Sequence, residues 1–253
     1  MTTQLISYNY NRNQVTAGIL HIGVGNFHRA HAEYYTNLLL EDASQQQWGI
    51  CGAMLLPGDE PLYRSLKSQE QIYTLTVCGR DGVDEAYRIG SLVELYWAME
   101  EAEAILAKIA DKSIRIITLT ITEGGYNMEK STGEFILDDP TIQHDLQNPL
   151  SPKTVFGFIA EGLRRRKALG NGPITILSCD NLQHNGNTAR KAFCTFFKAQ
   201  DEELAAWVAE NVTFPNSMVD RITPATRPED IVRLNEKNGT EKKCLQYFCL
   251  AIT

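Results

Sequence analysis

Short apolar segments alternate with longer amphipathic ones along most of the chain. Residues 18–24 are apolar and β-branched, and helical periodicity follows over 27–40, so the pattern predicts a strand, a glycine turn and a helix. A second apolar run over 48–56 stops at a Pro-Gly-Asp turn signal over 57–59. Two strands joined by a crossover helix run parallel, so this part of the chain predicts a β-α-β unit.

The next segment predicts a hairpin and then a helix. Residues 71–78 and 86–89 are strand-like and flank a turn at Asp81-Gly82. The stretch 91–110 is rich in Ala, Glu and Leu, which favours a helix over its whole length.

The second half of the chain again alternates short apolar segments with longer amphipathic ones. Residues 114–121 and 174–178 are near-continuous apolar runs, as expected of strands in the middle of a parallel sheet. A helix is predicted over 151–169, with Ser as N-cap and Pro at the first helical position, and another over 188–199. This order indicates a doubly wound, mainly parallel α/β fold, in which ligands bind at the carboxyl ends of the strands.

Composition and charge exclude several classes of function. Of 253 residues, 43% are hydrophobic and 22% charged, which is typical of a soluble globular protein. The formal charge of −7 argues against a nucleic-acid partner, and the one basic run, over 164–167, fits the carbonyl end of a helix. No segment has the roughly 20 apolar residues of a membrane span or the core of a signal peptide, so we expect no membrane partner and a cytoplasmic location.

Cysteine and histidine positions predict neither disulfides nor a metal centre. The six cysteines are scattered and form no Cys-x-x-Cys pair, so we expect reduced thiols. His28 and His31 are one helical turn apart, with His21 upstream, but no further ligand of suitable spacing accompanies them. We therefore expect no bound metal.

Gly23-Val-Gly25 matches the first two glycines of a dinucleotide fingerprint and lies between a predicted strand and a predicted helix. The first glycine would permit the tight turn, and the second would let the backbone approach a pyrophosphate, to which Arg29 could add a charge-assisted hydrogen bond. His28 stands in place of the third glycine. The motif alone is therefore also compatible with a methyltransferase.

Three polar residues have both a functional and a structural interpretation. Asp59, or its neighbour Glu60, could accept hydrogen bonds from an adenosine ribose, or Asp59 could simply stabilise a turn. Asn181 could polarise a carbonyl or hold an alkoxide, or belong to an Asx turn. Asp220 could serve a substrate site or pair with Arg221 at the surface. The residues alone leave these alternatives open.

Five sequence blocks, in order, resemble the polyol-specific long-chain dehydrogenase/reductase family, and mannitol 2-dehydrogenase most within it. The blocks are GILHIGVGNFHRAH (18–31), LTITEGGY (119–126), SPKTVFGF (151–158), SCDNLQHNG (178–186) and FPNSMVDRITP (214–224). This resemblance implies a Rossmann-type domain over 1–235 and a zinc-independent enzyme. It also implies hydride transfer between NAD and C2 of D-mannitol, giving D-fructose, so the expected partner is a small polyol or ketose.

The resemblance also assigns roles to individual residues. In the family, the counterpart of Asn181 helps to bind the reacting oxygen, and that of Asp220 supports the substrate site. Gly58 stands where many members carry a second acid that repels a 2′-phosphate, but we still expect NAD rather than NADP. The residues expected to bind the cofactor are Gly23, Gly25, Asn26, Phe27, His28, Arg29, Asp59, Thr122 and Glu123.

The likeness weakens after residue 236. The general base of the family is a lysine in a second, mainly helical domain, within a Lys-x-x-x-x-Asn-x-x-His motif, and this chain has no lysine followed five positions later by asparagine. We therefore expect residues 236–253 to be a tail unlike the family. We also expect the helical C-terminal domain to be missing through a frameshift, a truncation or gene decay. Little activity is expected as a result. The alternatives are a fructuronate or tagaturonate reductase of the same family and a non-catalytic NAD-binding module. The sequence predicts no oligomeric state.

Overall fold

The computed structural model describes residues 5–78, 84–219, 223, 227–230, 232, 236 and 248–252. Its centre is a six-stranded sheet in which all neighbouring strands are parallel. In spatial order these strands are β6 (Leu92–Trp97), β3 (Gly49–Met54), β2 (Ala17–Ile22), β7 (Ile116–Leu119), β8 (Ile174–Ser178) and β9 (Val212–Thr213). Numbered along the chain, they have the order 3-2-1-4-5-6, which confirms the doubly wound fold and places its topological switch point between β2 and β7.

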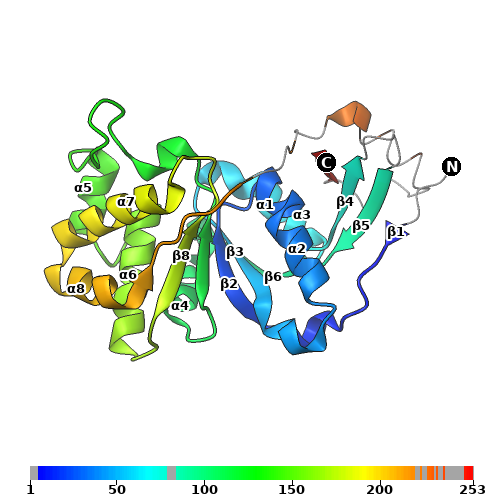
Figure 1. The fold of residues 1–253 in the computed structure, drawn as a ribbon, viewed down its shortest axis with the longest axis horizontal. Coiled ribbons are helices and arrows are strands. Elements are labelled where there is room, and N and C mark those ends of the chain that lie inside the picture. Colours follow the sequence, from blue (N-terminus) through cyan, green and yellow to red (C-terminus); the bar gives the residue numbers. More distant parts are fainter. Residues whose placement is uncertain are drawn as a thin grey trace.

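Helices cover both faces of this sheet (Figure 1). One face carries α1 (Asn26–Ala30), α2 (Ala32–Leu39) and α3 (Glu60–Ser68). The other carries α4 (Ala98–Ala110), α6 (Val155–Ala168), α7 (Asn185–Gln200) and α8 (Glu202–Asn211), with α5 (Pro140–Gln147) packed against α6 and α7. Right-handed crossovers explain this division, because the chain winds outward from the switch point in two opposite directions.

A second sheet has four strands, of which β4 and β5 lie between α3 and β6 in the chain and the other two come from its opposite ends. Its order is β1 (Leu5–Ile6), β5 (Asp84–Ile89), β4 (Tyr73–Cys78) and β10 (Phe248–Ile252). Strands β4 and β5 pair antiparallel along their full length, which confirms the predicted hairpin. The predicted turn at Asp81-Gly82 lies outside the described residues.

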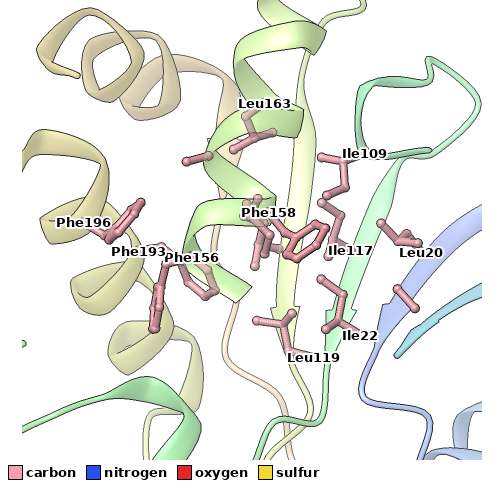
Figure 2. Packing of buried hydrophobic residues seen from close by; sticks show 14 of the residues in the cluster. Leu20, Ile22, Ile109, Ile117, Leu119, Phe156, Phe158, Leu163, Phe193 and Phe196 are labelled. Atoms are coloured by element: carbon pink, nitrogen blue, oxygen red, sulfur yellow. The ribbon is translucent and has the colours of Figure 1, made fainter. Parts of the chain in front are cut away.

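Each face of the six-stranded sheet has its own apolar core. On the α6 face, Leu20 and Ile22 of β2 and Ile117 and Leu119 of β7 pack with Phe158 of α6, and all five are at most 2% exposed (Figure 2). The core of the opposite face also binds the second sheet to the first. Its buried members include Ile50, Met54, Tyr63, Leu66, Tyr73, Leu75, Leu92, Leu95 and Trp97.

The basic run over 164–167 lies at the carboxyl end of α6, as predicted, but it is not a uniform solvated face. Arg166 is 1% exposed, and its guanidinium donates hydrogen bonds to five backbone carbonyls around the end of the helix. Burying a charge is tolerated there because its donors are all directed at acceptors. Arg166 therefore fastens the end of α6 to the neighbouring loops.

The prediction of a helix over 91–110 is wrong for its first seven residues. Residues 92–97 form strand β6, which pairs with β3, and only 98–110 is helical. The Ala and Glu content of the whole stretch favours a helix, but Val93 and Tyr96 suit a pleated surface. Pairing with β3 then decides the outcome, because strand preference depends mainly on tertiary context.

Two helix boundaries also differ from prediction. The helix expected over 27–40 is interrupted at His31, whose φ of −119° and ψ of −80° are not helical, so α1 and α2 are separate. The helix expected from Ser151 begins four residues later. Thr154 is its N-cap, because the Thr154 hydroxyl accepts a hydrogen bond from the backbone N–H of Gly157 at 3.2 Å.

Candidate nucleotide-binding site

A cleft of about 690 Å³ opens at the carboxyl ends of β2, β3 and β7, directly over the switch point. Doubly wound proteins bind their ligands at this place. The cleft is lined by Ile22, Gly23, Val24, Gly25, Leu55, Leu56, Asp59, Leu62, Thr120, Ile121, Thr122, Gly124, Gly125, Asn127, Asp139, Thr141, Ile142, Lys153, Thr154, Val155 and Phe156. A second hollow, of about 780 Å³, lies along the outer side of α7 and includes no strand end.

The glycine turn after β2 forms the floor of the cleft. Gly23 has a φ of +97°, and a Cβ at this position would lie 2.1 Å from the carbonyl oxygen of Thr120, so only glycine fits. A Cβ at Gly25 would have only the Gly23 carbonyl within 4 Å, at 3.8 Å. Gly23 is thus required by the protein's own packing, whereas the open space at Gly25 is free for the close approach of a ligand.

A neutral histidine supports the glycine turn from below. His21 is fully buried, and its Nδ1 lies 2.8 Å from the hydroxyl of Thr118, while its Nε2 lies 3.0 Å from both the Gly23 carbonyl and the hydroxyl of Thr120. Burial lowers the pKa of His21 to about 3. The ring is therefore neutral at pH 7, and an N–H at Nε2 can donate to the carbonyl of Gly23.

His28, which occupies the third position of the fingerprint, lies beneath the turn and does not line the cleft. It is 1% exposed, and its ring stacks on that of His21 with 3.3 Å between centroids and 2° between planes. Burial first, and then the neighbouring His21, Arg29 and His31, hold the pKa of His28 well below its ordinary value. Where a third glycine would let helix and strand approach, two neutral imidazoles pack face to face instead.

The three other residues of α1 expected to bind the cofactor also lie outside the cleft lining. Arg29 is 3% exposed, and its guanidinium donates to the side chain of Asn26 and, at 3.3 Å, to the carbonyl of Gly25. Phe27 stacks on His31, with 5.0 Å between ring centroids. Arg29 thus braces the glycine turn, which is a different contact from the pyrophosphate hydrogen bond that its charge suggested.

Asp59 has the structural role in a turn that the sequence suggested, and it also lines the cleft. It ends the short 3-10 helix η3 (Pro57–Asp59), where its Oδ2 accepts a hydrogen bond from the backbone N–H of Leu56 at 2.9 Å. It also lines the cleft beyond the end of β3, on the side of the strands that bind adenosine in doubly wound proteins. One carboxylate oxygen thus stabilises the turn, and a carboxylate has capacity for further donors.

The opposite wall of the cleft is formed where β7 ends. Thr122 lines it and adopts a φ of 64° and a ψ of 166°, a conformation found almost only in glycine. Glu123 and Asn181 are exposed beside this wall but do not line the cleft. Asp220 lies outside the described residues. Of the predicted site residues, the structure therefore brings together Gly23, Gly25, Asp59 and Thr122.

Two residues at or beside the cleft had no role that the sequence suggested. Lys153 lines it and brings a cation, but its Ser-Pro-Lys-Thr context was interpreted only as a helix start. Asp180 stands one residue before Asn181, and its carboxylate accepts hydrogen bonds from the backbone N–H groups of Ile121, at 3.1 Å, and Thr122, at 2.9 Å. The order of residues along the chain could not reveal these contacts across the sheet.

In the described part of the chain, no cluster of three or more His, Cys, Asp or Glu side chains is arranged to hold a metal ion. The helices of this part also include none with the length and apolar character needed to cross a membrane. Cys51, Cys78, Cys179 and Cys194, which the structure does describe, are free thiols.

A doubly wound sheet with a glycine turn and a cleft at its switch point defines a nucleotide-binding α/β protein. The family model of the mannitol dehydrogenase Rossmann domain matches residues 17–252, and the chain belongs to that family. This confirms the resemblance inferred from the five sequence blocks.

Individual relatives support the assignment. The chain is 44% identical over 234 residues to the polyol:NADP oxidoreductase of Gluconobacter oxydans (strain 621H), covering 92% of this chain and 48% of that protein. It is 40% identical over 237 residues to the D-mannonate oxidoreductase of Escherichia coli (strain K12), covering 93% of this chain and 48% of that protein. The chain thus spans about half the length of these relatives.

A solved structure shares the fold closely. The Pseudomonas fluorescens mannitol 2-dehydrogenase, in a ternary complex with NAD and D-mannitol, aligns with a TM-score of 0.94 and 41% sequence identity. The alignment covers 98% of this chain and 50% of that one.

Proposed function

We propose that the cleft over the switch point binds NAD(H), and that the protein serves hydride transfer between NAD and a polyol. The observation that carries this proposal is the position of Gly23 and Gly25 on the cleft floor, between Asp59 at the β3 end and Thr122 at the β7 end. Doubly wound proteins place the two nucleotides of a dinucleotide on either side of such a turn. The open space at Gly25 fits a pyrophosphate between them.

The two halves of the cofactor would contact different strands. Asp59 would accept hydrogen bonds from the adenosine ribose, while Thr122 and the exposed amide of Asn181 would lie toward the nicotinamide, over β7 and β8. Bound NAD would supply the hydride acceptor. The amide of Asn181 can donate a hydrogen bond to the substrate oxygen and stabilise its negative charge, and we assign Asp220 to the support of that substrate site.

We propose NAD rather than NADP as the cofactor. A carboxylate at the ribose site would repel the 2′-phosphate of NADP, although Gly58 supplies no second acid. The Gluconobacter relative is named for NADP, so the preference needs a direct measurement.

A fluorescence titration of the protein with NADH and NADPH provides that measurement. We expect NADH to bind about tenfold more tightly, or better, which corresponds to about 1.4 kcal/mol. Asp59→Asn keeps an acceptor for the Leu56 N–H but removes the charge, so the preference should shrink. Glu60, the other candidate acceptor in the sequence, does not line the cleft, so Glu60→Gln is the matched control and should change neither affinity. An unchanged preference in Asp59→Asn would refute the role of Asp59.

For the substrate, we propose the D-mannitol and D-fructose pair of the family. A hexuronate is the alternative, and the 40% identity with D-mannonate oxidoreductase keeps it in consideration. Following NADH absorbance with D-fructose, and separately with D-fructuronate, tests both substrates. Saturable NADH binding with neither reaction would favour a non-catalytic binding module.

A further inference from the structure

A buried carboxylate joins the ends of the neighbouring strands β7 and β8. Asp180 is 8% exposed and accepts three hydrogen bonds, from the N–H of Ile121 at 3.1 Å, the N–H of Thr122 at 2.9 Å and the hydroxyl of Tyr126 at 2.7 Å. All three donors belong to the segment that follows β7. Hydrogen bonds to a charged group contribute more to stability than neutral ones.

The backbone that Asp180 holds is strained. Thr122, with its φ of 64° and ψ of 166°, occupies a region that is unfavourable for a β-branched residue. The Thr122 side chain is exposed, so apolar packing does not compensate for this strain. The hydrogen bonds that Asp180 accepts from the N–H groups of Ile121 and Thr122 hold this backbone instead.

The remaining partners of Asp180 are themselves fixed. Burial, and then the charge of Asp180, raise the pKa of Tyr126 well above its ordinary value, so its hydroxyl stays protonated and donates to Asp180. The same hydroxyl lies 2.6 Å from the hydroxyl of Ser178, which is fully buried. The amide of Asn185 donates to the backbone carbonyl of Asp180 at 3.1 Å and to the hydroxyl of Ser217 at 2.9 Å.

We propose that Asp180 is a positioning residue that fixes Thr122, and with it the wall of the cleft on the nicotinamide side. This role rests on the proposed binding of NAD(H). Asp180 does not line the cleft, so it acts through the segment it holds. The floor at Gly23 and Gly25 has separate supports in His21 and Arg29, so the adenosine side does not depend on Asp180.

This separation predicts different effects on two ligands. In Asp180→Asn, the side chain keeps one acceptor oxygen and presents an amide N–H₂ in place of the other, so at least one of the three donors loses its acceptor. We expect the dissociation constant for NADH to rise about tenfold, equivalent to about 1.4 kcal/mol, while that for ADP stays within about twofold of the wild-type value. The shift in NADH fluorescence on binding, which reports the surroundings of the nicotinamide, should diminish.

The control is Asp201→Asn. Asp201 is also a carboxylate that accepts from a backbone N–H, that of Leu204 at 3.0 Å, but it caps α8 and is absent from the cleft lining. We expect Asp201→Asn to lower the melting temperature without changing the affinity for NADH or for ADP. If Asp180→Asn does not fold, Tyr126→Phe removes one donor to Asp180, keeps both backbone bonds, and should weaken NADH binding alone by a few-fold.

Two results would overturn the role of Asp180. One is an NADH affinity that stays at the wild-type value in folded Asp180→Asn or, should that variant not fold, in Tyr126→Phe. The other is an equal loss of NADH and ADP affinity, as a general structural defect would produce. A wild-type chain that binds neither ligand would instead overturn the proposed function, and the positioning role with it.

Discussion

Glu33 is a carboxyl group buried beside a neutral histidine, and this makes a sharp prediction about pH. It lies on α2 with no exposed surface, and its Oε1 is 3.3 Å from Nε2 of His28. Burial raises the pKa of Glu33 from its ordinary 4.5 to about 7, against smaller opposing effects of Tyr73 and Arg29. Because the pKa of His28 lies well below its ordinary value, Glu33 rather than His28 carries a proton below pH 7.

The effect on stability follows from proton linkage. Between pH 4.5 and 7 the folded protein holds a proton on Glu33 that the unfolded chain has released, so the free energy of unfolding falls as the pH rises. The contribution is complete below pH 4.5 and lost above about 7. At 1.36 kcal/mol per pH unit, this amounts to about 3 kcal/mol.

Glu33→Gln replaces the protonated carboxyl with a neutral group of the same shape. We expect the variant to gain stability relative to wild type as the pH rises, by about 3 kcal/mol between pH 4.5 and 7.5. Urea unfolding of both proteins at several pH values measures the difference in the free energy of unfolding. The pKa of His21 is also shifted, but most of its contribution is the same in both proteins and cancels in this difference. Glu210→Gln, at an exposed position of α8, is the control and should show no such trend.

A stability difference that is constant with pH would refute this reasoning. A difference of the opposite sign would mean that Glu33 is ionised in the folded protein and pairs with a protonated His28.

Two backbone positions give further predictions. Gly23→Ala places a Cβ 2.1 Å from the Thr120 carbonyl at a φ of +97°, so we expect a loss of about 2 kcal/mol or more in urea unfolding and of NADH binding in titration. Wild-type affinity in this variant would argue against the tight turn. Thr122→Gly relieves strain of about 1–3 kcal/mol but adds roughly 0.5–1 kcal/mol of unfolded-state entropy. Its melting temperature should therefore rise by a few degrees, and a fall would show that Thr122 is not strained.

Local patterns along the sequence determined the elements at the centre of the fold. The apolar run over 174–178 and the glycines at 23 and 25 could be interpreted without knowledge of partners, because side-chain periodicity reflects burial and a tight turn needs a residue that tolerates positive φ. The five sequence blocks likewise predicted the family. Asp59 was predicted beside the cleft for the same kind of reason, since the end of an inner strand must lie at that edge of the sheet.

Only the tertiary structure decided which side chains meet. Residues 92–97 became a strand because β3 offers a partner, although their composition is shared with the helix that follows. His28 lies in a motif that faces ligands elsewhere, but here it stacks on His21 beneath the turn. Asp180 reaches Thr122, 58 positions away in sequence, because β7 and β8 are neighbours. Periodicity records how deeply a residue is buried, whereas the identity of its partner depends on how the strands and helices are ordered in space.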